Sequence, residues 1–471
     1  MPKKTKIVCT LGPASRERSI MKQMLEAGMN VARLNFSHGT HEDHKKTIET
    51  FRSIRDELKL PAAVLLDTKG PEIRLGDFAK GSEILEDGDT FTLTSEPCAG
   101  TKERVSTTYR DLSTQVEPGT KILIDDGRIK MEVIETTDTD VICRVISGGK
   151  VSNRKGVNIP NKSLELEYIS EADRSDILFG IRMDVDYVAA SFVRSGDDVR
   201  ELRALLNGNG GEKIKIISKI ENMEGIRNFK EILELSDGIM VARGDMGVEV
   251  DFEKLPGIQK KFIKECCKAG KPVITATQML ESMTASPAPT RAEITDVANA
   301  VFDGTSAVML SGESAAGQYP VETVKTMAKI LKQAEQDAEE VNQYKFLEVE
   351  SDERDVSNAM GHAACTTARD IHAGAIVAVT TSGYTAEMMA KYKPTAPIIA
   401  ATPKEKTYHQ QALTRGVYPV LTRFSDNWND LMREAISGAE RMGFVKKGDQ
   451  VVLSAGMPLQ VSGTTNLIRV A

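Results

Sequence analysis

The first two thirds of the sequence repeat one unit: a short apolar run rich in β-branched residues, a polar turn, and a segment with helical periodicity. Strands that alternate with helices favour a parallel sheet, and eight such units close into a (β/α)8 barrel. Eight runs fit this pattern: KIVC (6–9), NVAR (30–33), AVLL (63–66), YVAA (187–190), KIIS (215–218), GIMVA (238–242), PVIT (272–275) and AVML (307–310). We therefore expect an α/β protein built on a TIM barrel.

The interval between the third and fourth runs is far too long for one strand–helix unit. From about Pro71 to Leu166 the chain alternates apolar and polar residues, with turn signals at Asp126-Gly127 and Gly148-Gly149. This pattern predicts a small, β-barrel-like antiparallel lid domain inserted after the third barrel strand.

A second region of alternating runs and helical segments follows the barrel. Its five apolar runs begin with AIVAV (375–379) and end with LIRV (467–470), which is too few for a second barrel. We expect an open α/β domain there. The predicted division is a barrel over 1–70 and 167–345, a lid domain over 71–166 and a C-terminal domain over 346–471.

Composition excludes several classes of protein. The formal net charge of −7 argues against a nucleic-acid partner, which needs a concentrated basic surface. The chain has no apolar run near the roughly 18 residues that a membrane helix needs, and its first residues lack a signal sequence. The six cysteines show no CxxC spacing, so we expect reduced thiols and a cytoplasmic location without membrane contact.

Polar residues follow most of the predicted barrel strands. Because the active site of such a barrel gathers at the carboxyl ends of its strands, we expect these side chains to converge on one mouth. The residues are Asn35, Ser37, Asp67, Thr68, Lys69, Lys219, Glu221, Arg243, Gly244, Asp245, Thr277, Ser311 and Glu313.

Two of these carboxylates suggest a metal site. Lys219 and Glu221 lie two apart on an extended segment and therefore share a face. Glu221 and Asp245, with no His or Cys beside them, suit Mg²⁺ or Mn²⁺, while Lys219 would face an anion. Gly244 lets the backbone approach a carboxylate closely. The alternative for Lys219 and Glu221 is a solvated ion pair.

The remaining motifs argue against a histidine metal site and against two common nucleotide-binding loops. His38, His41 and His44 have the spacing of a metal triplet, but they lie in THEDHKK, a charged helix start, so we expect a solvated helix face. The sequence contains no Walker A motif, and no GxGxxG follows a predicted strand, so any nucleotide is held by other means.

Long segments resemble the pyruvate kinase family, in its bacterial, three-domain, potassium-dependent form. The resemblance rests on KIVCTLGPAS (6–15), GMNVARLNFSHG (28–39), LLDTKGPEIR (65–74), ISKIEN (217–222), MVARGDMGVE (240–249), VITATQMLESM (273–283) and SGTTNLIRV (462–470). It covers essentially the whole chain in the family's order. It implies a glycolytic kinase that transfers the phosphoryl group of phosphoenolpyruvate to ADP.

The resemblance also implies roles for individual residues. Those expected to contact phosphoenolpyruvate are Arg33, Lys219, Gly244, Asp245 and Thr277, with Lys219, Arg33 and Thr277 in the catalytic step. Those expected to bind ions are Glu221 and Asp245 for Mg²⁺, and Asn35, Ser37, Asp67 and Thr68 for K⁺. Those expected to meet the nucleotide are Asn35, His38, Arg74 and Lys155.

Regulation is implied by the same resemblance. A Glu in the GPEIR segment accompanies K⁺ dependence in the family, and here it is Glu72. Two C-terminal loops match the family's effector-phosphate loops, which implies a phosphorylated allosteric effector and a homotetramer. The matching residues are Thr380, Ser382, Gly383, Thr385, Ser462, Gly463 and Thr464. Tyr384 stands where relatives often carry a basic residue, and an ordinary helix N-cap is the alternative for the first loop.

Two other functions remain open from the residues alone. One is a metal-dependent aldolase or lyase that acts on pyruvate enolates in the same barrel, which would need Glu221 and Asp245 but not Arg74 or Lys155. The other is a metabolite-sensing protein with an inactive barrel, against which the intact Lys219 and Thr277 argue.

Overall fold

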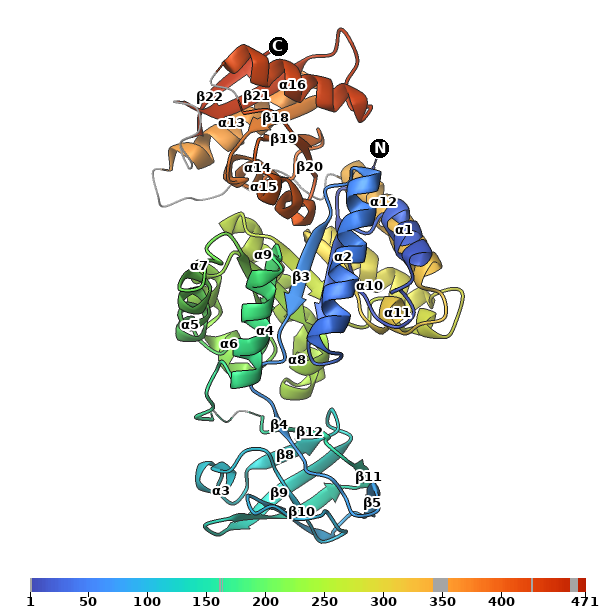
Figure 1. The fold of residues 1–471 in the computed structure, drawn as a ribbon, viewed down its shortest axis with the longest axis vertical. Coiled ribbons are helices and arrows are strands. Elements are labelled where there is room, and N and C mark those ends of the chain that lie inside the picture. The colour runs from blue at the N-terminus through green and yellow to red at the C-terminus, as the bar shows by residue number, and fades with distance from the viewer. Residues whose placement is uncertain (1, 161, 163, 342–354, 425–426, 458–464) are drawn as a thin grey trace.

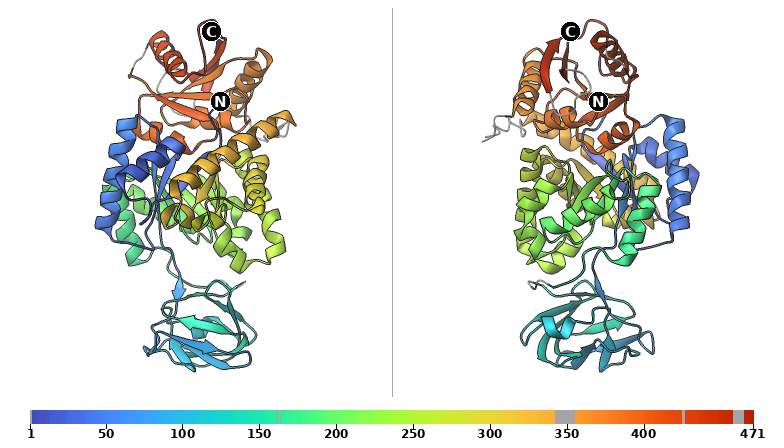
Figure 2. Two further views of the ribbon diagram at one scale, coloured as in Figure 1. Left: turned by 90° about the vertical axis from the view of Figure 1, so that its right-hand side faces the viewer. Right: turned by 60° about the vertical axis from the view of Figure 1, so that its left-hand side comes forward.

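The chain forms three parts stacked along its long axis, with the barrel in the middle (Figure 1). The structure is a computed structural model that describes residues 2–160, 162, 164–341, 355–424, 427–457 and 465–471. The inserted β domain lies at one end of the barrel and the C-terminal domain at the other (Figures 1 and 2).

Eight parallel strands close the central barrel, each with its neighbours in chain order once the insertion is set aside. They are β1 (Lys6–Thr10), β2 (Val31–Asn35), β3 (Ala63–Asp67), β13 (Tyr187–Ala190), β14 (Lys215–Ile220), β15 (Gly238–Ala242), β16 (Val273–Ala276) and β17 (Ala307–Leu310). Each corresponds to one of the eight predicted runs, and β1 pairs with both β2 and β17. The predicted fold class is confirmed.

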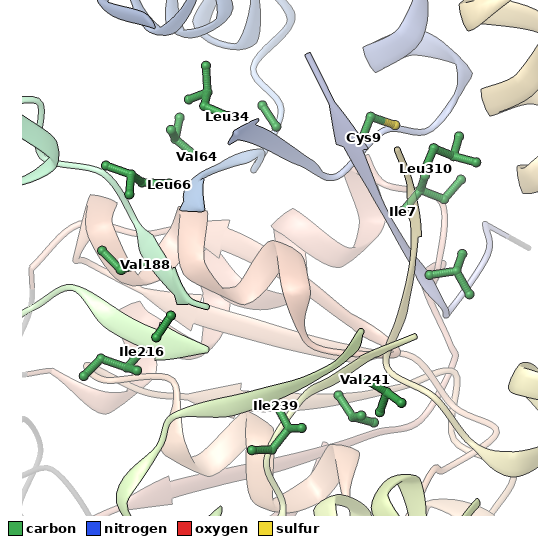
Figure 3. Packing of buried hydrophobic residues seen from close by; sticks show 14 of the residues in the cluster. Ile7, Cys9, Leu34, Val64, Leu66, Val188, Ile216, Ile239, Val241 and Leu310 are labelled. Atoms are coloured by element: carbon green, nitrogen blue, oxygen red, sulfur yellow. The ribbon is translucent and has the colours of Figure 1, made fainter. Parts of the chain in front are cut away.

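The barrel strands are buried on both faces, as expected for strands covered by helices. Side chains such as Val8, Leu65 and Met240 fill the barrel interior. The alternate side chains, including Ile7, Val64 and Ile216, belong to the layer between strands and helices (Figure 3). The covering helices are α1 (Arg18–Ala27), α2 (His41–Leu58), α4 (Glu171–Arg182), α5 (Gly196–Asn207), α6 (Met223–Arg227), α7 (Phe229–Leu235), α8 (Arg243–Glu249), α9 (Leu255–Ala269), α10 (Arg291–Asp303), α11 (Gly312–Ala315) and α12 (Pro320–Glu340).

The inserted segment forms a separate β domain with its own core, which includes Phe91, Ile122 and Val141. Its elements are β4 (Ile73–Arg74), β5 (Ser82–Leu85), β6 (Thr90–Thr94), β7 (Arg104–Ser106), α3 (Leu112–Gln115), β8 (Lys121–Ile124), β9 (Ile129–Thr136), β10 (Asp140–Ser147), β11 (Gly149–Ser152) and β12 (Gly156–Asn158).

Seven of these strands form one sheet in the order β4-β12-β8-β9-β10-β6-β7. The pairs are antiparallel as expected, except that β6 and β7 run parallel. A bridge between Leu75 and Thr107 joins the two edges of the sheet, which gives the domain its barrel-like closure.

The C-terminal domain is an open sheet in the order β20-β19-β18-β21-β22, in which β22 runs antiparallel to β21. Its elements are α13 (Val356–Asp370), β18 (Ala375–Val379), α14 (Tyr384–Ala390), β19 (Ile398–Thr402), α15 (Glu405–Gln410), the 3-10 helix η3 (Gln411–Leu413), β20 (Val417–Leu421), α16 (Trp428–Arg441), β21 (Val451–Gly456) and β22 (Thr465–Val470). The predicted open α/β arrangement is therefore present.

The amino end of the barrel is closed by the C-terminal domain. Ala412 and Leu413 of η3 are 1% and 0% exposed and belong to the same core cluster as the inward-facing barrel residues. The Tyr187 hydroxyl of β13 donates to the carbonyl of Gln410 at 2.5 Å. Burial of two apolar side chains from one domain in the barrel of the other couples the stability of both.

The six cysteines are free, and only Cys98 is not buried. Among the residues that the structure describes, no helix combines the length and hydrophobicity needed to span a bilayer.

Shortening Leu413 should destabilise the protein because its side chain fills the amino end of the barrel. We expect Leu413→Ala to lower the free energy of unfolding by about 2 to 5 kcal/mol, the usual cost of such a cavity. Leu421→Ala is the matched control, since Leu421 is 51% exposed and should cost no more than about 0.5 kcal/mol. Urea titrations followed by circular dichroism measure both variants. Equal midpoints would contradict the conclusion that the Leu413 side chain stabilises the protein by filling the amino end of the barrel.

Candidate active site at the barrel mouth

Four of the charged side chains buried at the carboxyl ends of the barrel strands form one cluster, at the end that faces the inserted domain; Glu313, also buried, instead accepts hydrogen bonds from the Leu280 and Ser311 amides. Arg33, Asp67, Lys219 and Glu221 are 8%, 0%, 8% and 1% exposed. They come from β2, β3 and β14, and from the residue that follows β14. Charged side chains are rarely buried to this extent unless they are paired, so their partners define the site.

Asp67 is the centre of this cluster. Its Oδ2 accepts a hydrogen bond from Arg33 Nε at 2.5 Å, and its Oδ1 accepts one from Lys219 Nζ at 3.0 Å. Burial alone would raise the pKa of Asp67, but Arg33 and Lys219 together hold it below its usual value. Asp67 is therefore an anion that fixes two cations at the mouth.

Lys219 has a second carboxylate partner. Its Nζ lies 3.1 Å from Glu221 Oε1 and donates to Ser191 Oγ at 2.7 Å. Burial alone would lower the pKa of Lys219, but Asp67 and Glu221 raise it above its usual value. The side chain is a permanent ammonium at neutral pH. The ion pair with Glu221, which was the alternative interpretation of these two residues, is present, but it is buried rather than solvated.

Glu221 has the features of a ligand for a divalent cation. Its Oε2 accepts a hydrogen bond from the Phe192 amide at 2.6 Å, whereas its buried Oε1 accepts none and has only the ion pair with Lys219 at 3.1 Å. Burial raises the pKa of Glu221 to about 7, with Lys219 opposing the rise and Asp245 adding to it. A divalent cation near Glu221 and the half-buried Asp245 would give Oε1 a second partner beside Lys219, so these two carboxylates fit Mg²⁺ or Mn²⁺.

The four residues expected to bind K⁺ lie at or just beyond the ends of two paired strands. Asn35 of β2 is opposite Asp67 of β3 in the sheet register. Asn35 Oδ1 accepts a hydrogen bond from the Ser37 amide at 3.1 Å, and Thr68 follows Asp67 directly. The four residues therefore lie near one another at this edge of the barrel, and all four side chains carry oxygen atoms.

The turn after β16 meets the start of α8. Thr277 has a left-handed backbone with φ 69°, and its Oγ1 accepts a hydrogen bond from the Gly244 amide at 3.2 Å. A Cβ at Gly244 would lie 3.4 Å from Thr277 Cγ2, so the Gly244 backbone packs closely against the Thr277 side chain. Gly244, Asp245 and Thr277 are thus brought together as expected.

A cavity of about 600 Å³ lies between the inserted domain and the barrel. Arg74 and Lys155 line it from the inserted domain, and Asp245 and Glu249 line it from α8. The pairing of β4 with β12 brings Arg74 opposite Gly156, next to Lys155. Asn35 and His38 do not line this cavity. Of the four residues expected to bind the nucleotide, the structure therefore brings only Arg74 and Lys155 together in it.

The two basic residues of the cavity are already paired. Arg74 Nη2 lies 2.6 Å from Glu72 Oε2, and Lys155 Nζ lies 2.7 Å from Asp125 Oδ1. Glu72 also lies 3.5 Å from Lys69, so it joins the barrel to the start of the inserted domain. A phosphate group in the cavity would compete with these carboxylates for the same cations.

Comparison with known protein families gives matches to two parts of the chain. The family model for the pyruvate kinase barrel domain matches residues 2–324, and that for the pyruvate kinase alpha/beta domain matches residues 358–471. The chain belongs to the pyruvate kinase family. The pyruvate kinase of Clostridium acetobutylicum is 48% identical over 470 residues, which cover 99% of each chain. That of Geobacillus stearothermophilus is 49% identical over 472 residues, covering all of this chain and 80% of the relative.

Similarity of this extent makes the chain an enzyme with pyruvate kinase function. The similarity is not confined to the barrel, because the pyruvate kinase of Clostridium perfringens is 45% identical over 469 residues, 99% of each chain. The resemblance inferred from the sequence is therefore confirmed for the whole chain.

The prediction for the three histidines was partly wrong. Among the described residues, no group of three or more His, Cys, Asp or Glu could hold a metal ion. His44 is not solvated either: it is 5% exposed and stacks on Phe36 with ring centroids 4.0 Å apart. His41 stacks on Phe179 and lies 2.6 Å from Asp176. His41 therefore connects α2 to α4, whereas His44 packs α2 against the residue that follows β2.

The first loop expected to bind an effector connects β18 to α14. Gly383 is the N-cap of α14 with φ 91°, so the helix does not begin with a Ser or Thr cap. Thr380 Oγ1 accepts a hydrogen bond from the Gly383 amide at 2.9 Å, and Thr385 bonds to Thr465 at 2.8 Å. Ser382 lies in the same loop. The residues of the second loop lie outside the described part of the chain: Ser462, Gly463 and Thr464.

Two residues of the charged cluster were missing from the predicted set. Ser191 follows β13 and donates to Asp67 Oδ1 at 3.2 Å, and Thr10 ends β1 and accepts from Arg33 Nη1 at 2.8 Å. Both follow the rule that selected the other site residues, since each is a polar residue at a strand end. Applying that rule to all eight strands would have found them.

Proposed function

We propose that the barrel mouth transfers the phosphoryl group of phosphoenolpyruvate to ADP, with pyruvate and ATP as products. The observation that carries this proposal is the buried cluster of Arg33, Asp67, Lys219 and Glu221 next to a cavity lined by Arg74 and Lys155. Phosphoryl transfer needs positioning and charge neutralisation more than covalent chemistry. An aldolase or lyase would not need Arg74 and Lys155, and an inactive barrel would not need the buried charges.

Arg33 and Lys219 supply fixed positive charge to the transferring group. Both are held by Asp67, so neither needs to reorient when the substrate arrives. Gly244, Asp245 and Thr277 form the part of the site that meets the rest of phosphoenolpyruvate. Lys219 also stabilises the enolate that remains after transfer, and water near Thr277 protonates it.

Mg²⁺ or Mn²⁺ is the divalent cofactor in this proposal, with Glu221 and Asp245 as its protein ligands. When bound, such an ion neutralises charge on phosphoryl oxygens. Asn35, Ser37, Asp67 and Thr68 hold K⁺ near the same group. Arg74 and Lys155, with Asn35 and His38 on the barrel side, meet the nucleotide, and the inserted domain excludes water that would otherwise accept the phosphoryl group.

Removal of the Lys219 charge should stop transfer without releasing the metal. We expect Lys219→Met to lower the turnover number by about 10²- to 10³-fold, the usual cost of one transition-state contact. Mn²⁺ binding, followed by electron paramagnetic resonance, should persist in this variant and be lost in Glu221→Ala. Lys213→Met is the control, because Lys213 is an exposed lysine just before the same strand. Wild-type turnover in Lys219→Met would remove this residue from the mechanism.

Activity should depend on K⁺. Glu72 occupies the position that accompanies this requirement, and its carboxylate lies between Lys69 and Arg74. We expect wild-type rates to fall strongly when tetramethylammonium replaces K⁺ at constant ionic strength. Glu72→Lys should weaken the requirement because it supplies a positive charge at the same place. Glu83→Lys, which changes another Glu paired with a Lys, is the control, and equal wild-type rates in both salts would refute the proposal.

The C-terminal domain carries the proposed regulation, in a cytoplasmic homotetramer. A phosphorylated effector would bind at Thr380, Ser382, Gly383 and Thr385, with Ser462, Gly463 and Thr464 from the second loop. The tight turn at the left-handed Gly383 supports this proposal, because it gathers the hydroxyls of Thr380 and Ser382 and the Gly383 and Tyr384 amides in one loop at the start of α14. Tyr384 contributes no charge, so the identity of the effector stays open between sugar phosphates and nucleoside monophosphates.

A negative charge in the first loop should abolish this response. We expect a sugar phosphate or nucleoside monophosphate to lower the half-saturating phosphoenolpyruvate concentration of the wild type, and Ser382→Asp to remove the effect by repulsion. Ser437→Asp on α16 is the control in the same domain and should respond normally. Hyperbolic, unchanged curves for all three proteins across a panel of such effectors would leave the loop as a helix cap only.

A further inference from the structure

Arg243 connects three elements at the barrel mouth. It is the first residue of α8, and its side chain is 10% exposed. Nε and Nη2 both donate to the carbonyl of Thr277, at 3.2 and 2.5 Å, and Nε also donates to that of Ala276 at 3.1 Å. Nη2 contacts Met279 Sδ at 2.9 Å as well. One guanidinium therefore binds the end of β16 and the turn that follows it.

A second set of contacts fixes the position of this guanidinium. Nη1 donates to both carboxylate oxygens of Asp296 on α10, at 2.9 and 2.6 Å, and lies 3.5 Å from Gln259 Oε1 of α9. The three nitrogen atoms of Arg243 are thus engaged by protein groups. The side chain has no donor directed to a substrate, so any effect on the reaction passes through the residues that it holds.

The turn that Arg243 holds is strained. Thr277 and Gln278 have φ angles of 69° and 56°, and neither is a glycine. A left-handed backbone costs an ordinary residue about 1 to 2 kcal/mol, so two in succession persist only where other contacts maintain them. The carbonyl bonds from Arg243 are such contacts, and they set the direction in which Thr277 Oγ1 faces the Gly244 amide.

We propose that Arg243 is a positioning residue, which holds the Thr277 turn against Gly244 and Asp245 so that together they fit the carboxylate end of phosphoenolpyruvate. This inference rests on the proposed roles of Gly244, Asp245 and Thr277. It predicts that Arg243 affects the affinity for phosphoenolpyruvate but not the affinity for the nucleotide. A lysine cannot replace it, because an ammonium lacks the planar fork that reaches two carbonyls and a carboxylate at once.

The test compares two arginines with similar contacts at opposite ends of the barrel. Arg203 donates to the carbonyl of Ile214 and pairs with Asp237 near the amino ends of β14 and β15. We expect Arg243→Lys to raise the KM for phosphoenolpyruvate at least tenfold and to leave the KM for ADP within twofold of wild type. Arg203→Lys should change neither constant. An unchanged KM for phosphoenolpyruvate in Arg243→Lys, an equal rise in both KM values, or the same rise in Arg203→Lys would overturn the inference.

A second variant decides the question if Arg243→Lys does not fold. Asp296→Asn keeps the shape of the anchor but removes its charge, and we expect it to raise the KM for phosphoenolpyruvate several-fold with the KM for ADP unchanged. An unaltered KM there would also overturn the inference. Thr277→Ala separates the two proposals. If it raises the KM for phosphoenolpyruvate while Arg243→Lys does not, only the role of Arg243 fails; if neither does, the proposed substrate site fails.

Discussion

The buried carboxylate of Asp67 is the interaction on which the barrel mouth depends. It accepts hydrogen bonds from Arg33 on β2, Lys219 on β14 and Ser191 after β13, so one side chain joins four consecutive strands of the barrel. Loss of one partner from a buried ion pair typically costs about 3 to 5 kcal/mol, because a charge is left without compensation. The strand that carries Asp67 also leads into the inserted domain, and Glu72 begins the contacts between the two parts. The arrangement of the mouth and the attachment of the inserted domain therefore share one strand.

Strand β14 has ionic contacts at both ends. Lys219 and Glu221 belong to the mouth at the carboxyl end, whereas Lys215 at the amino end pairs with Glu387 of α14 at 2.6 Å. Glu387 also accepts a hydrogen bond from Gln411 of η3, which precedes the residues that fill the barrel. The two ends of one six-residue strand are thus held by different domains. A shift of the C-terminal domain against the barrel would act directly on the strand that carries Lys219.

Much of the fold and of the site could be predicted from the sequence, because each barrel strand is a short apolar run followed by a polar residue. That rule identified Asp67, Lys219 and Asp245, whereas Arg33, which lies within a predicted strand, was indicated only by the family resemblance. The rule could not predict that Leu413 fills the barrel, since the pair Ala412-Leu413 in a polar stretch shows no periodicity and is buried only when two domains meet. His44 was assigned to a solvated face because its neighbours are charged, and its stacking on Phe36 depends on tertiary contacts. The role of Arg243 requires the β16 turn and α10 to be placed first.

The charges at the mouth are balanced in pairs before any ligand binds. Arg33 lies beside Asp67 and Lys219 beside Glu221, while Arg74 and Lys155 in the inserted domain have Glu72 and Asp125. An anionic substrate that entered alone would bring negative charge close to Glu221 and Asp245, and a divalent cation alone would face the Lys219 ammonium. If both enter together, the cation takes the carboxylates and the anion takes the basic groups, so that no buried charge is left unpaired. The pairing of the side chains thus favours joint binding of a cation and an anion over binding of either one.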